Sequence, residues 1–354
     1  MAYDAGNIFS IIWRESAAPY TIAMSRAGRT AAGVVLSILG ACLLVWQVRQ
    51  VGLADIQESL KRVGWGFLGI LALSFIRFVL RSIAWTAIIG GRVPLASAIG
   101  ATISGDAIGN ITPLSLIVSE PAKSIYLRDH IPVARSFAAL TAENFFYSVS
   151  VAIFIVLGIG ALLAGFVVND PQVRLAALLT LALMMAVLGA ALWIAWKKPA
   201  FASRGLGRLP FGRLDALVAR VRDLEETAYG FSKQAHGRLG TVIGCEIAFH
   251  LVSFAESYFT LWLITGASSP VAAFVLDTFN RIINVVFRWL PGRVGVDEYG
   301  TRRLAPIVGF SPVVGVTLAL VRKGRMLVWA AVGLALMARR GLSVRTLASD
   351  TPQP

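Results

Sequence analysis

Six long apolar segments most constrain what this chain can fold into. A helix needs about 20 apolar residues to cross a bilayer. Of the 354 residues, 56% are hydrophobic and 15% are charged, whereas about 25% of a typical soluble domain is charged. The apolar segments are 30–48, 64–90, 136–168, 175–196, 239–266 and 312–338. We therefore expect an all-α polytopic membrane protein with a single transmembrane domain at 1–338 and a cytoplasmic tail at 339–354.

The charge balance and the scarcity of reactive residues exclude several classes of function. A net charge of +14 would indicate nucleic-acid binding in a soluble protein. In a membrane protein, basic residues instead collect beside anionic lipid on the cytoplasmic side, so we expect no nucleic-acid partner. Cys42 and Cys245 lie in apolar segments, which excludes a disulfide framework. No residues have the spacing of a metal site, a catalytic constellation or a phosphate loop, so no cofactor and no enzymatic activity are expected.

Two further segments, 94–130 and 270–310, begin at a proline, continue as an apolar run, meet a second proline and then become polar. Each is either a complete span or a re-entrant helical hairpin, and charge decides between these. The segment 197–238 contains an amphipathic helix pattern and holds nine Lys/Arg against four Asp/Glu. We therefore expect it in the cytoplasm, together with both termini. Six spans satisfy this topology only if both proline-bounded segments are re-entrant. Residues 49–63 predict a separate interfacial helix.

The two proline-bounded segments also resemble each other. Prolines and charged residues recur at a nearly constant offset, in the pairs Pro94 and Pro270, Pro113 and Pro291, Glu120 and Glu298, Pro132 and Pro312, and Glu143 and Lys323. The unit span–hairpin–span thus occurs twice, at about 64–168 and 239–338, and the topology inverts one copy relative to the other. This predicts an inverted-topology repeat, the construction of many secondary transporters. The alternative is that prolines and glycines punctuate any membrane protein.

Several charged residues fall inside the predicted spans, where they are costly and usually face a cavity or a partner. They are Arg77, Arg81, Glu143, Glu246, His250, Glu256, Arg322, Lys323 and Arg325. Arg77 and Arg81 are four positions apart and so lie on one helix face. We expect them to face the acids of the third and fifth spans. We interpret the set as a polar path for a lipid head group, and the alternative is that buried ion pairs only fix helix register.

The second hairpin contains RWLPGRVGVDEYGTRR at 288–303. Non-helical backbone at membrane depth must be buried in protein or line a water-filled cavity. Helix starts and arginines there would attract an anion, and the planar guanidinium suits phosphate. Candidates for head-group binding and translocation are Arg77, Arg81, Asn110, Glu120, Lys123, Glu143, Arg288, Arg293, Asp297, Glu298, Arg322 and Arg325. Candidates for proton transfer or ion pairing are Glu246, His250 and Glu256. The alternative is an interfacial loop whose arginines reach toward lipid head groups.

Four stretches resemble a known family, the flippase-like transmembrane domain of lysylphosphatidylglycerol synthases and its stand-alone bacterial relatives. They are FIRFVLRSIAWTAII (75–89), GNITPLSLIVSEPAKSIYL (109–127), LPGRVGVDEYG (290–300) and LALVRKGRMLVWAAVGLAL (318–336). The third is similar to the family's Pro-Gly-x-x-Gly-x-x-Glu motif and the last to its arginine-containing final span. In the second, Pro113-Leu114 stands where the family has Pro-Gly. The resemblance covers about 30–338 and is closest to a branch associated with hopanoid genes.

The resemblance implies lipid translocation across the bacterial inner (cytoplasmic) membrane. In the fused enzymes a separate soluble domain makes the aminoacylated lipid, and we find no such domain here. We therefore expect a flippase that binds the head group of a phospholipid or other polar lipid between the two hairpins. Transport would need no ATP and would be passive or coupled to protons or ions. The alternatives are a membrane-embedded enzyme and a scaffold of lipid biosynthesis. The lipid, the direction and any homo-oligomer stay open.

Overall fold

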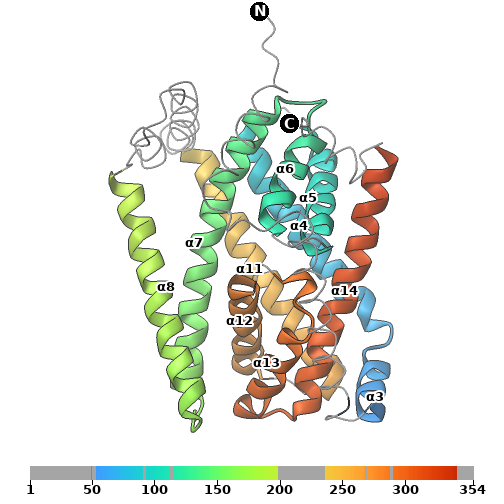
Figure 1. Cartoon of the computed structure of the whole chain (residues 1–354), viewed down its shortest axis with the longest axis vertical. Coiled ribbons are helices and arrows are strands. Elements are labelled where there is room, and N and C mark those ends of the chain that lie inside the picture. The colour runs from blue at the N-terminus through green and yellow to red at the C-terminus, as the bar shows by residue number, and fades with distance from the viewer. Residues whose placement is uncertain are drawn as a thin grey trace, which may run out of the picture.

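A computed structural model describes most of the chain, and every element in the described part is a helix (Figure 1). The described residues are 49, 53–90, 93–111, 115–197, 236–267, 269–287 and 290–340. The α-helices are α3 (Leu53–Val63), α4 (Gly66–Ile89), α5 (Leu95–Ile111), α6 (Ser115–Tyr126), α7 (Val133–Gly165), α8 (Pro171–Lys197), α11 (His236–Thr265), α12 (Pro270–Val286), α13 (Val296–Leu304) and α14 (Pro312–Arg339). Two short 3-10 helices are η1 (Pro291–Arg293) and η2 (Ala305–Val308). The predicted span at 30–48, Arg288, and most of 197–238 lie outside the described residues.

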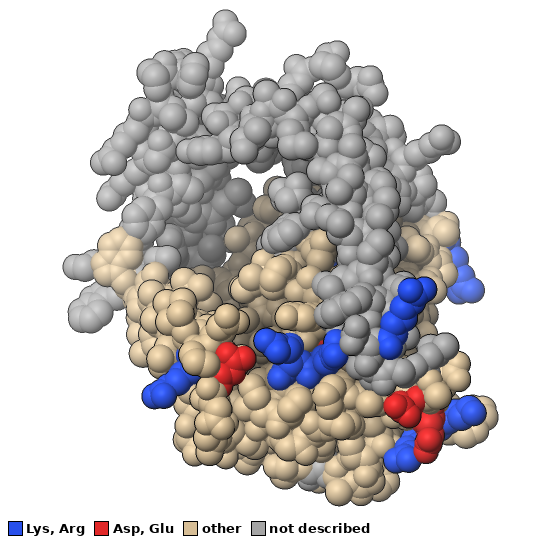
Figure 2. Space-filling model, turned by 60° about the horizontal axis from the view of Figure 1, so that its bottom comes forward, with Lys and Arg blue, Asp and Glu red and all other residues tan. Residues whose placement is uncertain are grey.

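Four of the described helices are long and apolar enough to cross a membrane, namely α4, α7, Pro171–Trp193 of α8 and Arg238–Thr265 of α11. The helix α14 has 28 residues, but it carries three cations near its middle. Buried residues make up 44% of the apolar window of α11 and only 6% of that of α8, so α11 is central and α8 peripheral. Most of the described surface seen in Figure 2 carries neither acidic nor basic side chains. The chain is thus a multi-pass, all-α membrane protein, as predicted.

Two pairs of shorter helices lie at opposite ends of the bundle (Figure 1). The pair α5 and α6 begins and finishes at the end where α4 finishes and α7 begins. The pair α12 and α13 lies at the other end, between the last residue of α11 and the first of α14. Both α5 and α12 have 17 residues, or about 26 Å, which is less than the ~30 Å of a hydrocarbon core. The same order of long and short helices therefore occurs twice.

Glycines let the short helices approach the long ones closely. A Cβ on Gly158 of α7 would lie 1.9 Å from Oγ1 of Thr278 in α12. A Cβ on Gly333 of α14 would lie 2.6 Å from the backbone oxygen of Ile103 in α5. A Cβ at either glycine would force the neighbouring helix to shift. Packing through small residues is the usual basis of helix association in lipid, and here it holds each pair of short helices against a long helix.

The predicted amphipathic helix after the first span is present as α3. Its apolar residues Ile56 and Val63 are buried, at 2% and 4% exposure, and they face α11 and α14. Its charged residues lie on the exposed side. Trp65 follows in the turn before α4 and is 87% exposed, which suits the head-group region, where tryptophan is enriched.

Candidate functional site

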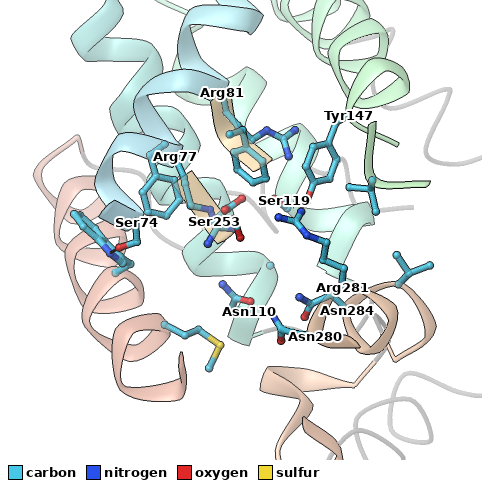
Figure 3. Close-up of a pocket in the computed structure, with 18 of the residues that line it drawn as sticks. Ser74, Arg77, Arg81, Asn110, Ser119, Tyr147, Ser253, Asn280, Arg281 and Asn284 are labelled. Atoms are coloured by element: carbon cyan, nitrogen blue, oxygen red, sulfur yellow. Dashed lines mark hydrogen bonds between the residues drawn. The ribbon is translucent and has the colours of Figure 1, made fainter. Parts of the chain in front are cut away.

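A cavity of about 420 Å³ lies inside the bundle, and both pairs of short helices contribute to its wall (Figure 3). Eight of its lining residues are lysine or arginine and three are aspartate or glutamate. The basic ones are Arg77, Arg81, Lys123, Arg281, Arg293, Arg322, Lys323 and Arg325, and the acidic ones are Asp106, Glu120 and Asp297. Charged side chains inside a membrane bundle usually face a cavity or pair with one another, and here they do both.

The two arginines of α4 bind acids of neighbouring helices. Arg81 donates hydrogen bonds of 2.9 and 2.6 Å to the two carboxylate oxygens of Glu143 in α7. Glu143 is only 1% exposed. Arg77 lies 3.2 Å from a carboxylate oxygen of Glu256 in α11. The predicted pairing of these arginines with acids of the third and fifth spans is therefore confirmed, and Glu246, the other candidate of the fifth span, forms neither ion pair.

Glu256 is shared between two arginines. Arg77 binds its Oε2 atom, and Arg325 of α14 binds its Oε1 atom. Both arginines line the cavity, whereas Glu256 lies behind them. Because one carboxylate neutralises only one guanidinium, this triad leaves an excess positive charge at the cavity wall.

The first pair of short helices has the opposite balance. The ammonium of Lys123 lies 3.2 Å from a carboxylate oxygen of Asp106 and 3.2 Å from one of Glu120. Asn144 of α7 donates a hydrogen bond of 2.9 Å to the other oxygen of Glu120. The side chain of Asp106 is 44% exposed. Since two carboxylates face one ammonium, this cluster leaves an excess negative charge at its side of the cavity.

Arg281 and Arg322 are held in buried ion pairs. Arg281 lies 3.1 Å from Asp277, one turn earlier in α12, and Asp277 also accepts a hydrogen bond from Ser253 of α11. Arg322 of α14 lies 3.9 Å from Asp297 of α13. Each pair is neutral in sum. The Ser253–Asp277 hydrogen bond joins α11 to α12, and the Arg322–Asp297 pair joins α14 to α13.

The turn of the second helix pair reaches the first pair at the cavity. Arg293 in η1 donates a hydrogen bond of 3.2 Å to the side-chain oxygen of Asn110 in α5. Lys323 of α14 donates to the backbone carbonyl of Gly292, next to Arg293. The irregular backbone at this turn is therefore buried in protein beside a polar cavity, which is the condition expected for non-helical chain at membrane depth.

Comparison with known proteins gives a family match, which covers most of the chain. Residues 30–334 match the family described as Lysylphosphatidylglycerol synthase TM region. This chain belongs to that family. No curated protein and no solved structure gives a match. Membership of the lysylphosphatidylglycerol synthase TM family agrees with the predicted resemblance and associates the chain with membrane lipids. All of the cavity-lining residues fall within the matched range.

Within this family member, the cavity brings together nine of the predicted site residues. They are Arg77, Arg81, Asn110, Glu120, Lys123, Arg293, Asp297, Arg322 and Arg325. The predicted residues Glu143 and Glu256 lie directly behind the wall as ion-pair partners. The structure thus places residues from distant parts of the sequence at one site, and their role in lipid binding is a proposal.

Three predicted residues lie away from the cavity. Glu298 is 0% exposed and accepts a hydrogen bond of 2.7 Å from the backbone N–H of Gly295, which caps α13. Glu246 accepts a hydrogen bond of 2.9 Å from Ser150 of α7. The same Ser150 hydroxyl lies 2.9 Å from Nε2 of His250. Ser150 thus joins the buried side chains of Glu246 and His250 in a hydrogen-bonded chain. No group of residues suited to a metal ion occurs in the described part of the chain.

The sequence analysis missed several residues of the cavity, chiefly in α12. Arg281 and its partner Asp277 are four positions apart, the same spacing that singled out Arg77 and Arg81. Asn280 and Asn284 are also four apart, and Figure 3 shows both beside Arg281 at the cavity. The segment was predicted as the apolar run of the second hairpin, and none of these residues was among the candidates for the site. Attention to polar residues at this spacing would have identified them.

Proposed function

We propose that this protein is a lipid transporter of the bacterial inner membrane that binds a lipid head group in the cavity. The observation that carries this proposal is the charged cavity enclosed by a bundle with an apolar exterior. Charged side chains are costly at membrane depth and are retained there for a polar substrate or a partner. Membership of a family associated with a membrane lipid supports the same function.

The head group in this proposal carries an anionic group. Arg77 and Arg325 share one carboxylate and so provide the excess positive charge that an anion needs. Arginine binds phosphate with two parallel hydrogen bonds. The cluster of Asp106, Glu120 and Lys123, with its excess negative charge, would receive a hydroxyl or amine of the same head group. The cavity volume of about 420 Å³ is within the range of small-molecule sites, roughly 300–1,000 Å³.

The two pairs of short helices are, in this proposal, the re-entrant hairpins of an inverted repeat formed by 64–168 and 239–338. They start from opposite ends of the bundle (Figure 1) and meet at the hydrogen bond between Arg293 and Asn110. Movement of one repeat against the other would expose the site to each side of the membrane in turn. We place the end of the bundle with 197–238 in the cytoplasm, because this segment is rich in lysine and arginine.

Transport in this proposal does not use ATP. It is either passive or driven by a proton or ion gradient. The chain of Glu246, Ser150 and His250 is the candidate proton carrier, since it is internally hydrogen-bonded and its acid and its imidazole are buried. Collapse of the proton gradient across loaded vesicles would separate the two modes, because only coupled transport would slow.

Reconstitution tests the proposed function. The full-length protein would be placed in liposomes with a fluorescent phospholipid, and a membrane-impermeant reductant added outside. We expect fluorescence to disappear from both leaflets, faster than in protein-free liposomes. Arg325→Gln should slow this process, and Arg174→Gln, an exposed residue at the start of α8, should not. Chemical conversion of the lipid would indicate an enzyme, and neither movement nor conversion would favour a scaffold.

A further inference from the structure

The rim of the cavity differs from its interior. Among the described residues that line the cavity, only Ser148, Val187 and Val285 are exposed when backbone and side chain are taken together. They come from α7, α8 and α12 in that order. The lysine and arginine side chains of the interior are less exposed, for example 8% for Arg322 and 5% for Lys123, whereas the side chain of Asp106 is 44% exposed. These residues place an opening along α7, between α8 and α12, and two of its three exposed residues are valines.

The wall just inside this rim is also apolar. It is formed by Val151 and Ala152 of α7 and Met184 of α8, which are 7%, 2% and 7% exposed. Val187 follows Met184 by three positions, so both lie on one face of α8. Aliphatic side chains of α7 and α8 therefore lie beside the opening, in the same cavity as the charged residues.

The helix α8 lies at the edge of the bundle, beside α7 (Figure 1). Its buried residues Ala177, Met184 and Ala191 recur every seventh position, a single stripe that packs chiefly on α7. Neighbouring side chains point outward, as in Met185 at 54% and Leu192 at 72% exposure. The part of the rim on this helix suits hydrocarbon, because the side chains of α8 around Val187 are apolar.

We propose that the corner of α7, α8 and α12 is a lateral portal, through which the acyl chains of the bound lipid extend into the bilayer. This rests on the proposed function. Moving acyl chains from hydrocarbon into water costs free energy in proportion to the apolar area exposed. A lipid whose head group lies among the arginines therefore needs an apolar exit for its tails, and the structure provides one at the rim of the same cavity.

A reversible block of the portal tests this inference. In full-length protein with Cys42→Ser and Cys245→Ala, Val187→Cys would be modified in liposomes with a bulky, apolar methanethiosulfonate. The matched control is Met185→Cys, which lies on the same helix, is exposed, and does not line the cavity. We expect modification at position 187 to reduce lipid movement to the rate of protein-free liposomes. A thiol reductant should restore it, whereas modification at position 185 should have no effect.

Three outcomes would contradict the portal. The first is unchanged transport after complete modification at position 187, and the second is equal loss at both positions. The third concerns water. If a charged, impermeant thiol reagent modifies Val187→Cys as fast as Glu58→Cys, at an exposed position of α3, the opening meets water. If the unmodified protein moves no lipid, the proposed function fails. The portal is then tested by the amount of phospholipid that the protein retains during purification. Modification at position 187, and not at 185, should then lower the retained phospholipid in native mass spectrometry.

Discussion

Arg293 donates a hydrogen bond of 3.2 Å to the side-chain oxygen of Asn110, although 183 positions separate them in the sequence. Asn110 belongs to the last turn of α5, and Arg293 lies in the turn after α12. The bond therefore joins the two pairs of short helices at the wall of the cavity. In the proposed mechanism it is a contact that must form and break as the repeats move.

This contact predicts coupling between its partners. Asn110→Ala and Arg293→Ala should each destabilise the protein, and the double variant should lose less than the sum. The difference should be about 1 kcal/mol, the size of one partly buried hydrogen bond. Unfolding in mixed micelles by sodium dodecyl sulfate would measure it. Strictly additive losses would show that the bond contributes nothing to stability.

The backbone at Arg293 predicts a second effect. Its φ is 50°, in the left-handed region that costs a residue with a Cβ roughly 1–2 kcal/mol relative to glycine. Arg293→Gly should therefore unfold at a higher detergent concentration than Arg293→Ala. Both variants should transport lipid poorly, because both lack the guanidinium at the cavity. Equal stability of the two would mean that the backbone relaxes without cost.

The two arginines of α4 should differ in importance for folding. Arg81→Ala leaves Glu143 buried, and among the described residues Arg81 is the one cation in an ion pair with it. Breaking such a pair costs about 3–5 kcal/mol. Arg77→Ala should cost less, because Glu256 keeps Arg325. Addition of Glu143→Ala to Arg81→Ala should recover much of the lost stability, as measured in the same unfolding assay. Equal losses for the two single variants would argue against this ion-pair arrangement.

Close packing of α7 on α12 predicts opposite results at two nearby glycines. Gly158→Ala would place a Cβ 1.9 Å from Thr278, and overpacking of this kind costs about 1–3 kcal/mol. Gly160 has nothing within 4 Å of the corresponding position. Gly160→Ala should therefore leave stability unchanged or raise it slightly, because alanine favours the helix. Thermal unfolding in detergent compares them, and a stable Gly158→Ala variant would contradict the packing.

The sequence by itself determined the class of protein and the positions of most helices. In lipid, every backbone polar group must be bonded within the protein, so long apolar segments can only be helices. The prolines at 94, 132, 270 and 312 come just before or at the first residue of α5, α7, α12 and α14, since proline suits the start of a helix and not its interior. The i and i+4 spacing also placed Arg77 and Arg81 on one helix face before any neighbour was known.

Only the tertiary structure decided which charges meet. Glu143, Glu246 and Glu256 were equal candidates as partners for the α4 arginines, and Glu246 instead accepts a hydrogen bond from Ser150. Glu298 caps its own helix, and Arg281 joins the cavity from a segment that looked apolar. The physical reason is that periodicity determines where a side chain points on its own helix. Which helix faces it depends on the order of helices around the bundle and on how closely they pack, as α7 and α12 do at Gly158.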